Sequence, residues 1–250
     1  MPHAADLVAA ARERTGLAVL EGLHPLKHAL RFGAVVTACV VEEGCDLVAE
    51  AAELAPDLPG RLSVPPQVVP ASTFAALCRR RPPVPVIAVA VRPTAGASDA
   101  LEGAGPVVAL EDPVHLGNLG AVVRVAAAAG AAGVLTTGRA DPWHPAALRG
   151  GAGLQFALPV VRVDALPPTQ RPVVAFDPGG APLGGADVDP RSMLVFGSER
   201  AGLSAQVRER AHRVVAIPMR DGVSSLNLAT SVAVALYAGV ASLPLPYDGG

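Results

Sequence analysis

Five residues in the second half of this sequence have side chains suited to binding a polar ligand: Asn118, Arg124, Glu199, Ser225 and Asn227. Small polar side chains such as Asn and Ser accept hydrogen bonds from N–H groups at helix starts, where ligands are also bound. A guanidinium grips phosphate with two parallel hydrogen bonds, and a carboxylate accepts hydrogen bonds from a nucleoside. Together these residue types favour recognition of a phosphate-bearing, nucleoside-like ligand.

Apolar and glycine residues lie next to these polar groups. Ile217, Met219 and Leu226 are close in the chain to Ser225 and offer the flat apolar contact that an adenine ring needs. Gly197, two residues before the carboxylate, permits a tight turn and a close approach of the backbone. Ile217, Met219 and Leu226 are therefore candidates for apolar contact with an adenine ring.

Each segment taken by itself also fits an ordinary structural role. Asn118 or Ser225 can cap a helix, Glu199 can interact with a helix N-terminus, and Arg124 can reach past its apolar neighbours to solvent. These readings remain open at the level of the single segment.

The elements that would position these residues follow a strand–loop–helix pattern from Pro106 onward. Apolar runs typical of buried strands occupy residues 107–110, 133–137, 159–163, 173–176, 193–196 and 213–217. Helices are predicted after the Asn118 loop, over 204–210 and over 228–237. This alternation predicts an α/β fold whose sheet is mostly parallel, with helices on both faces. Ligands bind such sheets beyond the carboxyl ends of the strands, where all three polar segments fall.

The first part of the chain predicts a smaller α/β unit. Helices are expected over 24–32, 46–54 and 72–80, the last with Ser72 as its N-cap, and strands over 34–41 and 84–91. Small residues over 93–98 resemble a linker. We therefore divide the chain into a small α/β domain (1–93), a linker (94–105) and a larger domain (106–250).

Composition limits the function classes. The 250 residues are 51% hydrophobic but only 3% aromatic, so the core must consist mainly of Ala, Val and Leu. A net charge of −2 gives no general attraction for nucleic acid, so any such site must be local. Three cysteines without metal-ligand spacing predict buried free thiols, and we expect no bound metal. The sequence has neither an apolar leader nor a membrane-length apolar run, which favours a cytoplasmic protein.

The three polar segments resemble, in order and spacing, those of the SpoU (TrmH-like) branch of the SPOUT RNA methyltransferases. That pattern is Asn-x-Gly-Ala-x-x-Arg, then Gly-x-Glu-x-x-Gly, then Ile-Pro-Met with Ser-Leu-Asn shortly after. The matching residues are Asn118, Gly120, Ala121, Arg124, Gly197, Glu199, Gly202, Ile217, Pro218, Met219, Ser225, Leu226 and Asn227. The resemblance covers about residues 106–240. It extends more weakly to the N-terminal unit, which looks like the RNA-binding domain that many members carry.

The resemblance implies S-adenosylmethionine as methyl donor and the 2′-hydroxyl of an RNA ribose as acceptor. It also implies that Gly197, Ile217 and Leu226 contact the adenosine of the cofactor, with Met219 nearby. It also implies a C-terminal trefoil knot, a rare exception among folds, and a homodimer. The resemblance further implies that Arg124 grips the phosphate beside the target ribose and stabilises the alkoxide. Four other residues would hold Arg124 and the ribose in place: Asn118, Glu199, Ser225 and Asn227. Ribosomal RNA is the preferred substrate. The alternatives are a transfer RNA methyltransferase and a catalytically silent RNA-binding or ribosome-assembly protein of the same fold.

RNA contacts would have to come from local clusters of basic residues. Of the 20 basic residues only Lys27 is a lysine. The candidate clusters are Lys27 with Arg31, Arg79–Arg81, and Arg208 with Arg210 and Arg213, although such clusters are often only solvated surface.

Three residues depart from the family pattern. Ser198 stands where Asn is common, and Gly151 where many members have Ser. Asp221 replaces a small residue and adds negative charge beside the presumed cofactor loop.

Overall fold

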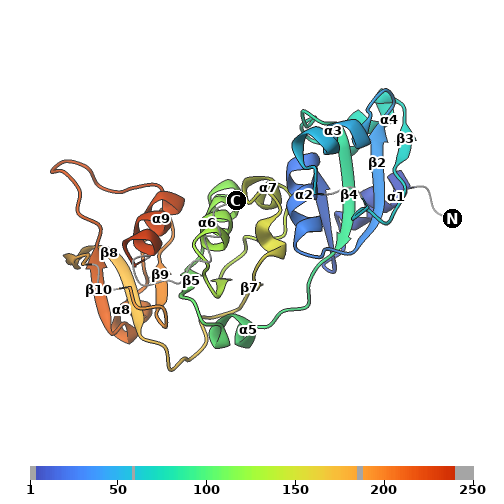
Figure 1. Cartoon of the computed structure of the whole chain (residues 1–250). Coiled ribbons are helices and arrows are strands. Elements are labelled where there is room, and N and C mark those ends of the chain that lie inside the picture. The colour runs from blue at the N-terminus through green and yellow to red at the C-terminus, as the bar shows by residue number, and fades with distance from the viewer. Residues whose placement is uncertain (1–3, 58–59, 185–187, 240–250) are drawn as a thin grey trace. The chain divides into compact units, whose positions relative to one another are not determined.

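The structure, a computed structural model, describes residues 4–57, 60–184 and 188–239 (Figure 1). Its contacts divide the chain into two compact units. The first consists of Met1–Thr94 with Trp143–Ala157, and the second of Ala95–Pro142 with Leu158–Gly250. The chain therefore passes from one unit to the other three times.

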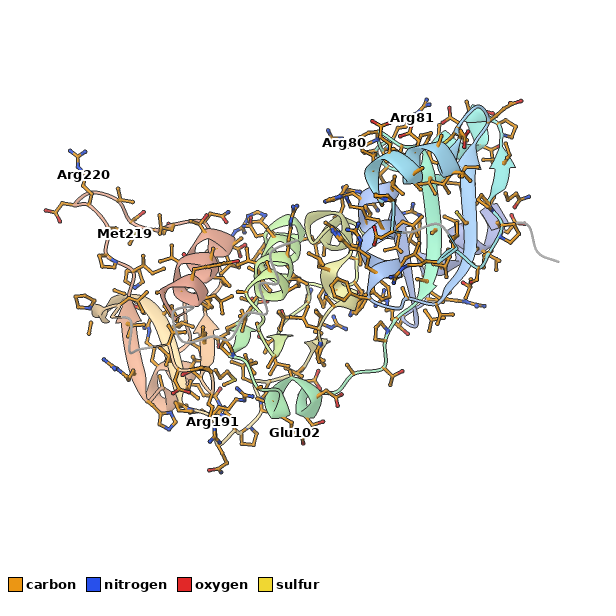
Figure 2. All side chains as sticks on the ribbon, in the orientation of Figure 1. Arg80, Arg81, Glu102, Arg191, Met219 and Arg220 are labelled. Carbon is orange, nitrogen blue, oxygen red and sulfur yellow. The ribbon has the colours of Figure 1, made fainter. Side chains whose placement is uncertain are left out.

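The first unit contains a four-stranded mixed sheet in the order β1-β4-β2-β3. The strands are β1 (Leu17–Glu21), β2 (Val36–Glu42), β3 (Gln67–Val69) and β4 (Val86–Val91), with β4 antiparallel to β1 and β2. The helices are α1 (Ala4–Ala11), α2 (Leu23–Arg31), α3 (Leu47–Leu54) and α4 (Ala71–Leu77). The segment from α4 to β4 carries the exposed side chains of Arg80 and Arg81 (Figure 2).

The helices and strands predicted for this unit are confirmed, but α1, β1 and β3 were not anticipated. The prediction of Ser72 as the N-cap of α4 is wrong. Pro70 holds that position, with a φ of −58°, and its carbonyl accepts from the Phe74 N–H at 2.9 Å. The helix ends at Leu77 rather than Arg80, because Cys78 adopts an extended backbone.

The second unit contains a six-stranded sheet in the order β10-β8-β9-β5-β6-β7, and every neighbouring pair is parallel. The strands are β5 (Val107–Leu110), β6 (Gly133–Thr136), β7 (Val160–Arg162), β8 (Val173–Pro182), β9 (Met193–Phe196) and β10 (Arg213–Ala216). The helices are α5 (Ala97–Glu102), α6 (Leu116–Ala128), α8 (Ala205–Arg210) and α9 (Leu228–Gly239). The predicted α/β fold with a parallel sheet is confirmed. The knot stays a prediction.

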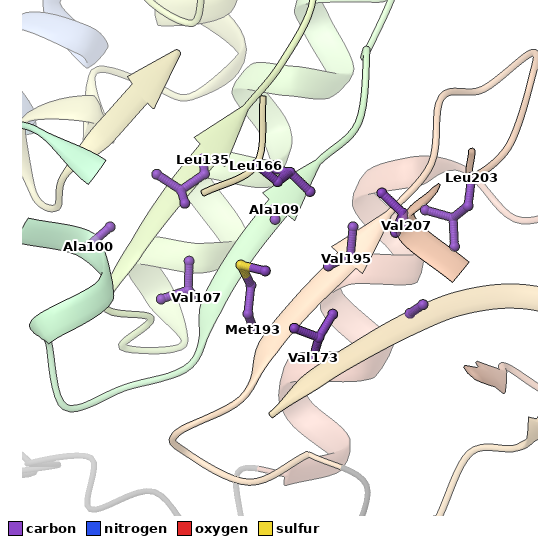
Figure 3. Close-up of a cluster of buried hydrophobic side chains, with 11 residues drawn as sticks. Ala100, Val107, Ala109, Leu135, Leu166, Val173, Met193, Val195, Leu203 and Val207 are labelled. Atoms are coloured by element: carbon purple, nitrogen blue, oxygen red, sulfur yellow. The ribbon is translucent and has the colours of Figure 1, made fainter. Parts of the chain in front are cut away.

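One face of this sheet is covered by a cluster made mostly of Ala, Val and Leu side chains. Figure 3 shows Val107, Ala109, Met193 and Val195 on adjacent strands within it, and all four are buried. Such side chains pack closely on a pleated surface. A core built with few aromatic residues agrees with the composition.

The stretch predicted as a linker contains helix α5. The Gly96 N–H donates to the Asp99 carboxylate at 2.7 Å, which closes the first turn of the helix. Ala100 is fully buried and joins the cluster of Figure 3. The prediction of a linker over 94–105 is therefore wrong for Ala97–Glu102. Burial of Ala100 stabilises this helix, whereas the small residues around it gave no helical pattern in the sequence.

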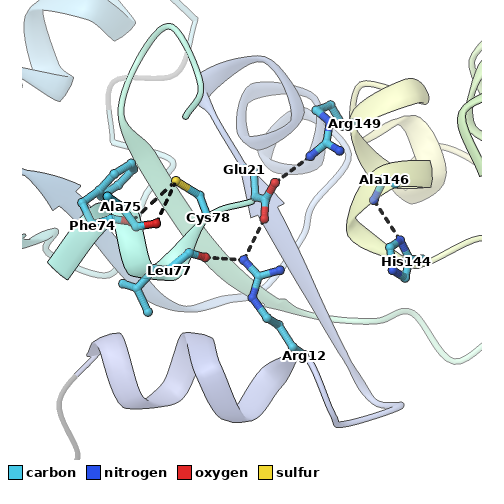
Figure 4. A network of polar contacts seen from close by, with 9 residues as sticks. All are labelled: Arg12, Glu21, Phe74, Ala75, Leu77, Cys78, His144, Ala146 and Arg149. Carbon is cyan, nitrogen blue, oxygen red and sulfur yellow. Dashed lines mark hydrogen bonds and ion pairs between the residues drawn. The ribbon is translucent and has the colours of Figure 1, made fainter. Parts of the chain in front are cut away.

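Residues Trp143–Ala157 pack with the first unit although they follow β6 in the chain. They form α7 (Pro145–Gly150) and a 3₁₀ turn, η1 (Leu154–Phe156). Arg149 of α7 donates to Glu21 at 2.6 Å, and the ring of His28 lies 2.8 Å from the Ala152 carbonyl. Figure 4 shows Glu21 between Arg149 and Arg12, which donates to its other oxygen at 2.7 Å. The first unit is thus completed by residues that we had assigned to the 106–250 domain.

Three features of the described residues bear on function. None of their helices has the length and apolar character needed to cross a membrane. They contain no cluster of His, Cys, Asp or Glu able to hold a metal ion. All three cysteines are free thiols, but only Cys39 is buried, while Cys45 and Cys78 are half-buried, so the expectation of three buried thiols is met at one position. Burial raises the pKa of the Cys39 thiol to about 12.

Candidate active site

The three polar segments meet at the carboxyl ends of the parallel strands, each directly after a strand. Their side chains form a continuous hydrogen-bonded chain. The Asn118 amide donates to Glu199 at 3.0 Å, and its carbonyl oxygen accepts from the Asn227 amide, also at 3.0 Å. Glu199 further accepts from the Val114 N–H at 3.0 Å. Residues from three distant parts of the sequence are therefore fixed in one polar network.

A cavity of about 490 Å³ lies beside this network. Eight of the nine predicted site residues line it: Asn118, Gly197, Glu199, Ile217, Met219, Ser225, Leu226 and Asn227. The rings of Phe176 and Phe196, stacked 4.5 Å apart between β8 and β9, line the same cavity. The cavity thus combines flat apolar surface with polar side chains.

The loop after β9 is held in a tight turn. Ser198 and Gly202 exchange two backbone hydrogen bonds of 3.1 and 3.0 Å. The Ser198 hydroxyl also accepts from the N–H groups of Arg200 and Ala201. A Cβ at Gly197 would overlap the backbone of Gly202 and Leu203, so this position requires glycine. Ser198, which departs from the family pattern, has a definite role in closing the turn.

Two of the ordinary structural readings are wrong in their details. Helix α6 begins at Leu116 with His115 as its N-cap, so Asn118 lies inside the first turn and its side chain is free to bond Glu199. At the start of α9, Asn227 rather than Ser225 acts as the cap, because its side-chain oxygen accepts from the Ala229 N–H at 2.9 Å. Asn227 therefore caps a helix and belongs to the polar network at once.

Arg124 lies apart from the other eight residues. It is exposed on α6 and does not line the cavity. Six residues along a helix amount to about one and two-thirds turns, which places Arg124 on a different side of α6 from Asn118. The structure therefore does not bring Arg124 into the cavity of its own chain.

Several residues that line the cavity were missed by sequence reasoning. Asp177 follows the buried part of β8, and His115 precedes α6. Both follow the buried part of a parallel strand, and this position could have marked them as site residues from the sequence. Neither residue matches a motif. Arg208 of α8 holds the Asp177 carboxylate through two hydrogen bonds, of 3.1 and 2.7 Å.

The cavity is acidic. Its lining contains the carboxylates of Asp177 and Glu199 and no Lys or Arg among the residues described. Burial raises the pKa of the Glu199 carboxyl, but the hydrogen bonds from Asn118 and the Val114 N–H outweigh this effect and leave the pKa below its usual value. Glu199 is therefore ionised at neutral pH. Asp221, which departs from the family pattern, is exposed and lies outside this lining.

Comparison with family models matches residues 105–237 to the SpoU rRNA Methylase family. The chain belongs to the SpoU rRNA methylase family. The match begins just before β5 and ends within α9, so it contains all three polar segments and the whole six-stranded sheet.

Relatives within the SpoU family include ribosomal RNA methyltransferases. A 23S rRNA (adenosine(1067)-2′-O)-methyltransferase of Streptomyces laurentii is 37% identical over 61% of this chain and 60% of its own length. The 23S rRNA (guanosine(2553)-2′-O)-methyltransferase of Bacillus subtilis is 28% identical over 90% of this chain and 89% of its own. In two further curated relatives, 39% and 34% identical, this SpoU chain spans only about half of the relative's length, 49% and 51%.

A solved structure shares the fold across both units. The SpoU methyltransferase AviRb from Streptomyces viridochromogenes, in complex with the cofactor AdoMet, matches with a TM-score of 0.75 and 27% identity. The match covers 92% of this SpoU chain and 91% of AviRb.

Proposed function

We propose that this chain transfers a methyl group from S-adenosylmethionine to the 2′-hydroxyl of a ribose in ribosomal RNA, in the cytoplasm. The support is family membership, the named activities of the relatives and the AdoMet held by AviRb. The observation that carries the proposal is the acidic, partly aromatic cavity bordered by the chain Glu199–Asn118–Asn227.

The cavity suits this cofactor by charge and by shape. When bound, S-adenosylmethionine supplies a methyl group on a sulfonium cation. Glu199 offers a carboxylate to that cation. Asp177 lines the same cavity, but Arg208 already balances its charge at 2.7 Å. Ile217 and Leu226 provide apolar contact for an adenine ring, and the lack of a side chain at Gly197 lets the ligand approach the backbone there.

The polar network would act by positioning. Holding the acceptor oxygen in line with the methyl carbon removes most of the entropic cost of bringing two reactants together. Asn118, Glu199 and Asn227 are already fixed by one another, so little reorganisation is needed when the ribose arrives. Ser225 lines the same cavity and supplies a further hydroxyl for the ribose.

Arg124 would act on the RNA rather than on the cofactor. A guanidinium keeps its proton at ordinary pH, so it cannot serve as the base that removes the 2′-hydroxyl proton. Because Arg124 lies outside the cavity of its own chain, it would act at the cavity of a second copy in the homodimer proposed below. There it would grip the phosphate next to the target ribose and stabilise the developing alkoxide, while that phosphate accepts the proton.

Replacing Arg124 by Ala tests the assignment. We expect transfer of tritiated methyl to 23S rRNA to be lost, while the affinity for S-adenosylmethionine measured by calorimetry changes less than twofold. Arg139→Ala, another exposed arginine of the second unit, is the control and should retain transfer. Equal loss of cofactor affinity and transfer in Arg124→Ala would instead indicate a structural role.

The same assays separate the alternatives. Methyl incorporation into transfer RNA but not ribosomal RNA would support the tRNA enzyme. RNA binding without affinity for S-adenosylmethionine would support a catalytically silent assembly protein.

We also propose that the chain forms a homodimer through the face of the second unit that contains α9. Two large apolar side chains of α9 remain exposed, Val234 and Tyr237. Exposed apolar side chains grouped around one helix are typical of protein interfaces. Light scattering should give twice the mass of one chain, and Tyr237→Glu with Val234→Glu should reduce it to one.

A further inference from the structure

A second cavity, of about 740 Å³, lies within the first unit. It opens over the carboxyl end of β1 and the start of α2, with the segment after α4 along another side. Its lining consists of Glu21, Gly22, Leu23, His24, Pro25, Lys27, Leu54, Arg80, Arg81, Pro82, Pro83, Val84 and Arg149. Neither the SpoU model match nor the polar network extends to this cavity, apart from Arg149, which lies within the matched range.

The cavity is strongly basic. Four cations, Lys27, Arg80, Arg81 and Arg149, line it against the single carboxylate of Glu21. This contrasts with the acidic cavity of the second unit and with the net charge of −2 for the whole chain. These four basic residues therefore form a local positive site in a chain that is slightly acidic overall.

Buried carboxylates hold two of these cations in place. Glu21 is 5% exposed and accepts from Arg149 at 2.6 Å, and Glu42 is 6% exposed and accepts from Arg81, also at 2.6 Å. Each guanidinium has five N–H donors, of which these contacts occupy one. The Arg81 and Arg149 side chains are 61% and 42% exposed, so their remaining donors are accessible to a ligand.

The other two cations are uncommitted. Among the residues that the structure describes, no hydrogen bond or ion pair engages the side chains of Lys27 and Arg80. The N-terminus of α2, at Gly22 and Leu23, also lines the cavity, and helix N-termini favour anions. Leu23, Leu54 and Pro82 supply an apolar wall. A ligand that satisfies all of these groups carries phosphate and a flat ring.

We propose that this cavity holds a nucleotide of the RNA substrate, with its phosphates against Lys27, Arg80, Arg81 and Arg149 and its base against the apolar wall. The inference rests on the proposed function, since it takes RNA as the substrate. It assigns Arg149, which lies within the SpoU-matched range, to substrate binding in the first unit.

The test measures RNA affinity separately from methyl transfer. The double variant Lys27→Gln/Arg80→Gln removes two uncommitted cations whose loss should not affect folding, and Arg14→Gln removes an exposed arginine of the same unit outside the cavity. Filter binding to a radiolabelled transcript of 23S rRNA, without cofactor and over a range of salt, gives the affinity and its salt dependence for each protein. Calorimetry with S-adenosylmethionine shows whether each variant keeps its affinity for the cofactor at the cavity of the second unit.

We expect the double variant to bind this RNA roughly tenfold more weakly, and the slope of log affinity against log salt to fall by about 0.7 to 0.9 for each lost phosphate contact. Affinity for S-adenosylmethionine should be unchanged in both variants. An affinity and slope equal to those of the unaltered protein would overturn the proposal, as would an equal loss in Arg14→Gln. If the unaltered protein binds the transcript but transfers no methyl group, the proposed function fails while this site is still tested.

Discussion

The side-chain amide of Asn118 donates to Oε1 of Glu199 across 3.0 Å, although 81 residues separate the two in the chain. Glu199 is exposed, so this contact is not a product of core packing. It exists because β5 and β9 are adjacent parallel strands whose carboxyl ends bring the two following loops together. The sheet order thus determines which side chains can share a hydrogen bond at the site.

Replacing Asn118 by Asp should make the rate of methyl transfer rise as the pH falls. Two carboxylates at this distance cannot both be ionised without strong repulsion, so the pair is expected to share one proton and to have a raised pKa. We expect little transfer at pH 8 and a partial recovery as the pH falls toward 5. The measurement is the rate of tritiated methyl transfer across this range, beside the unaltered protein. A uniform loss at every pH would contradict it.

Glu199 should contribute to stability in a pH-dependent way. Its pKa is below the usual value of 4.5 in the folded chain, so the contribution is complete above that pH and is lost as the pH falls through the folded pKa. The difference in unfolding free energy between the unaltered protein and Glu199→Gln should therefore shrink from pH 7 to pH 4. Urea denaturation at both pH values measures it, and a difference that stays constant would show that the charge of Glu199 is immaterial.

Substitution by alanine should have different effects at Gly197 and Gly117. A Cβ at Gly197 would overlap the Gly202 backbone, whereas nothing lies within 4 Å of a Cβ at Gly117. Gly197→Ala should lower the unfolding free energy by about 1 to 3 kcal/mol and weaken cofactor binding. Gly117→Ala, on helix α6, should be neutral or stabilising by up to about 1 kcal/mol. Calorimetry and urea denaturation test both, and similar behaviour of the two variants would argue against a steric requirement at Gly197.

Removing the arginines that pair with buried Glu21 should lower the unfolding free energy more than removing Glu21 itself. Removing both partners in Arg12→Leu/Arg149→Leu leaves a 5%-exposed carboxylate without its counter-charges, which costs about 3 to 5 kcal/mol. Glu21→Leu removes the buried charge itself and leaves two arginines that reach solvent, so its cost should be smaller. Urea denaturation at pH 7 ranks the variants, and the opposite order would contradict the argument.

The sequence allowed prediction of much of the site because its polar residues follow buried strands. Eight of the nine predicted residues line one cavity, since parallel strands align their carboxyl ends. Arg124 was placed with them by its motif spacing, but six helical residues turn it away from Asn118. Asp177 was missed because it belongs to no motif and is recognisable only once β8 and β9 are adjacent.

The parts of the fold that escaped prediction have weak local signals. Helix α5 is six residues long and begins in a run of small residues, and its stability comes from burying Ala100. Strand β3 has three residues and pairs only with β2. Short elements of this kind depend on distant partners, which periodicity in the sequence does not reveal.

The return of residues Trp143–Ala157 to the first unit has a consequence for engineering. A chimera made by joining residues 1–94 to another methyltransferase would lack Arg149, the partner of Glu21, and the Ala152 carbonyl that His28 meets. The first unit therefore cannot be exchanged by replacing a single continuous segment of the chain. Grafting its specificity onto another scaffold requires transplanting two separate pieces of chain.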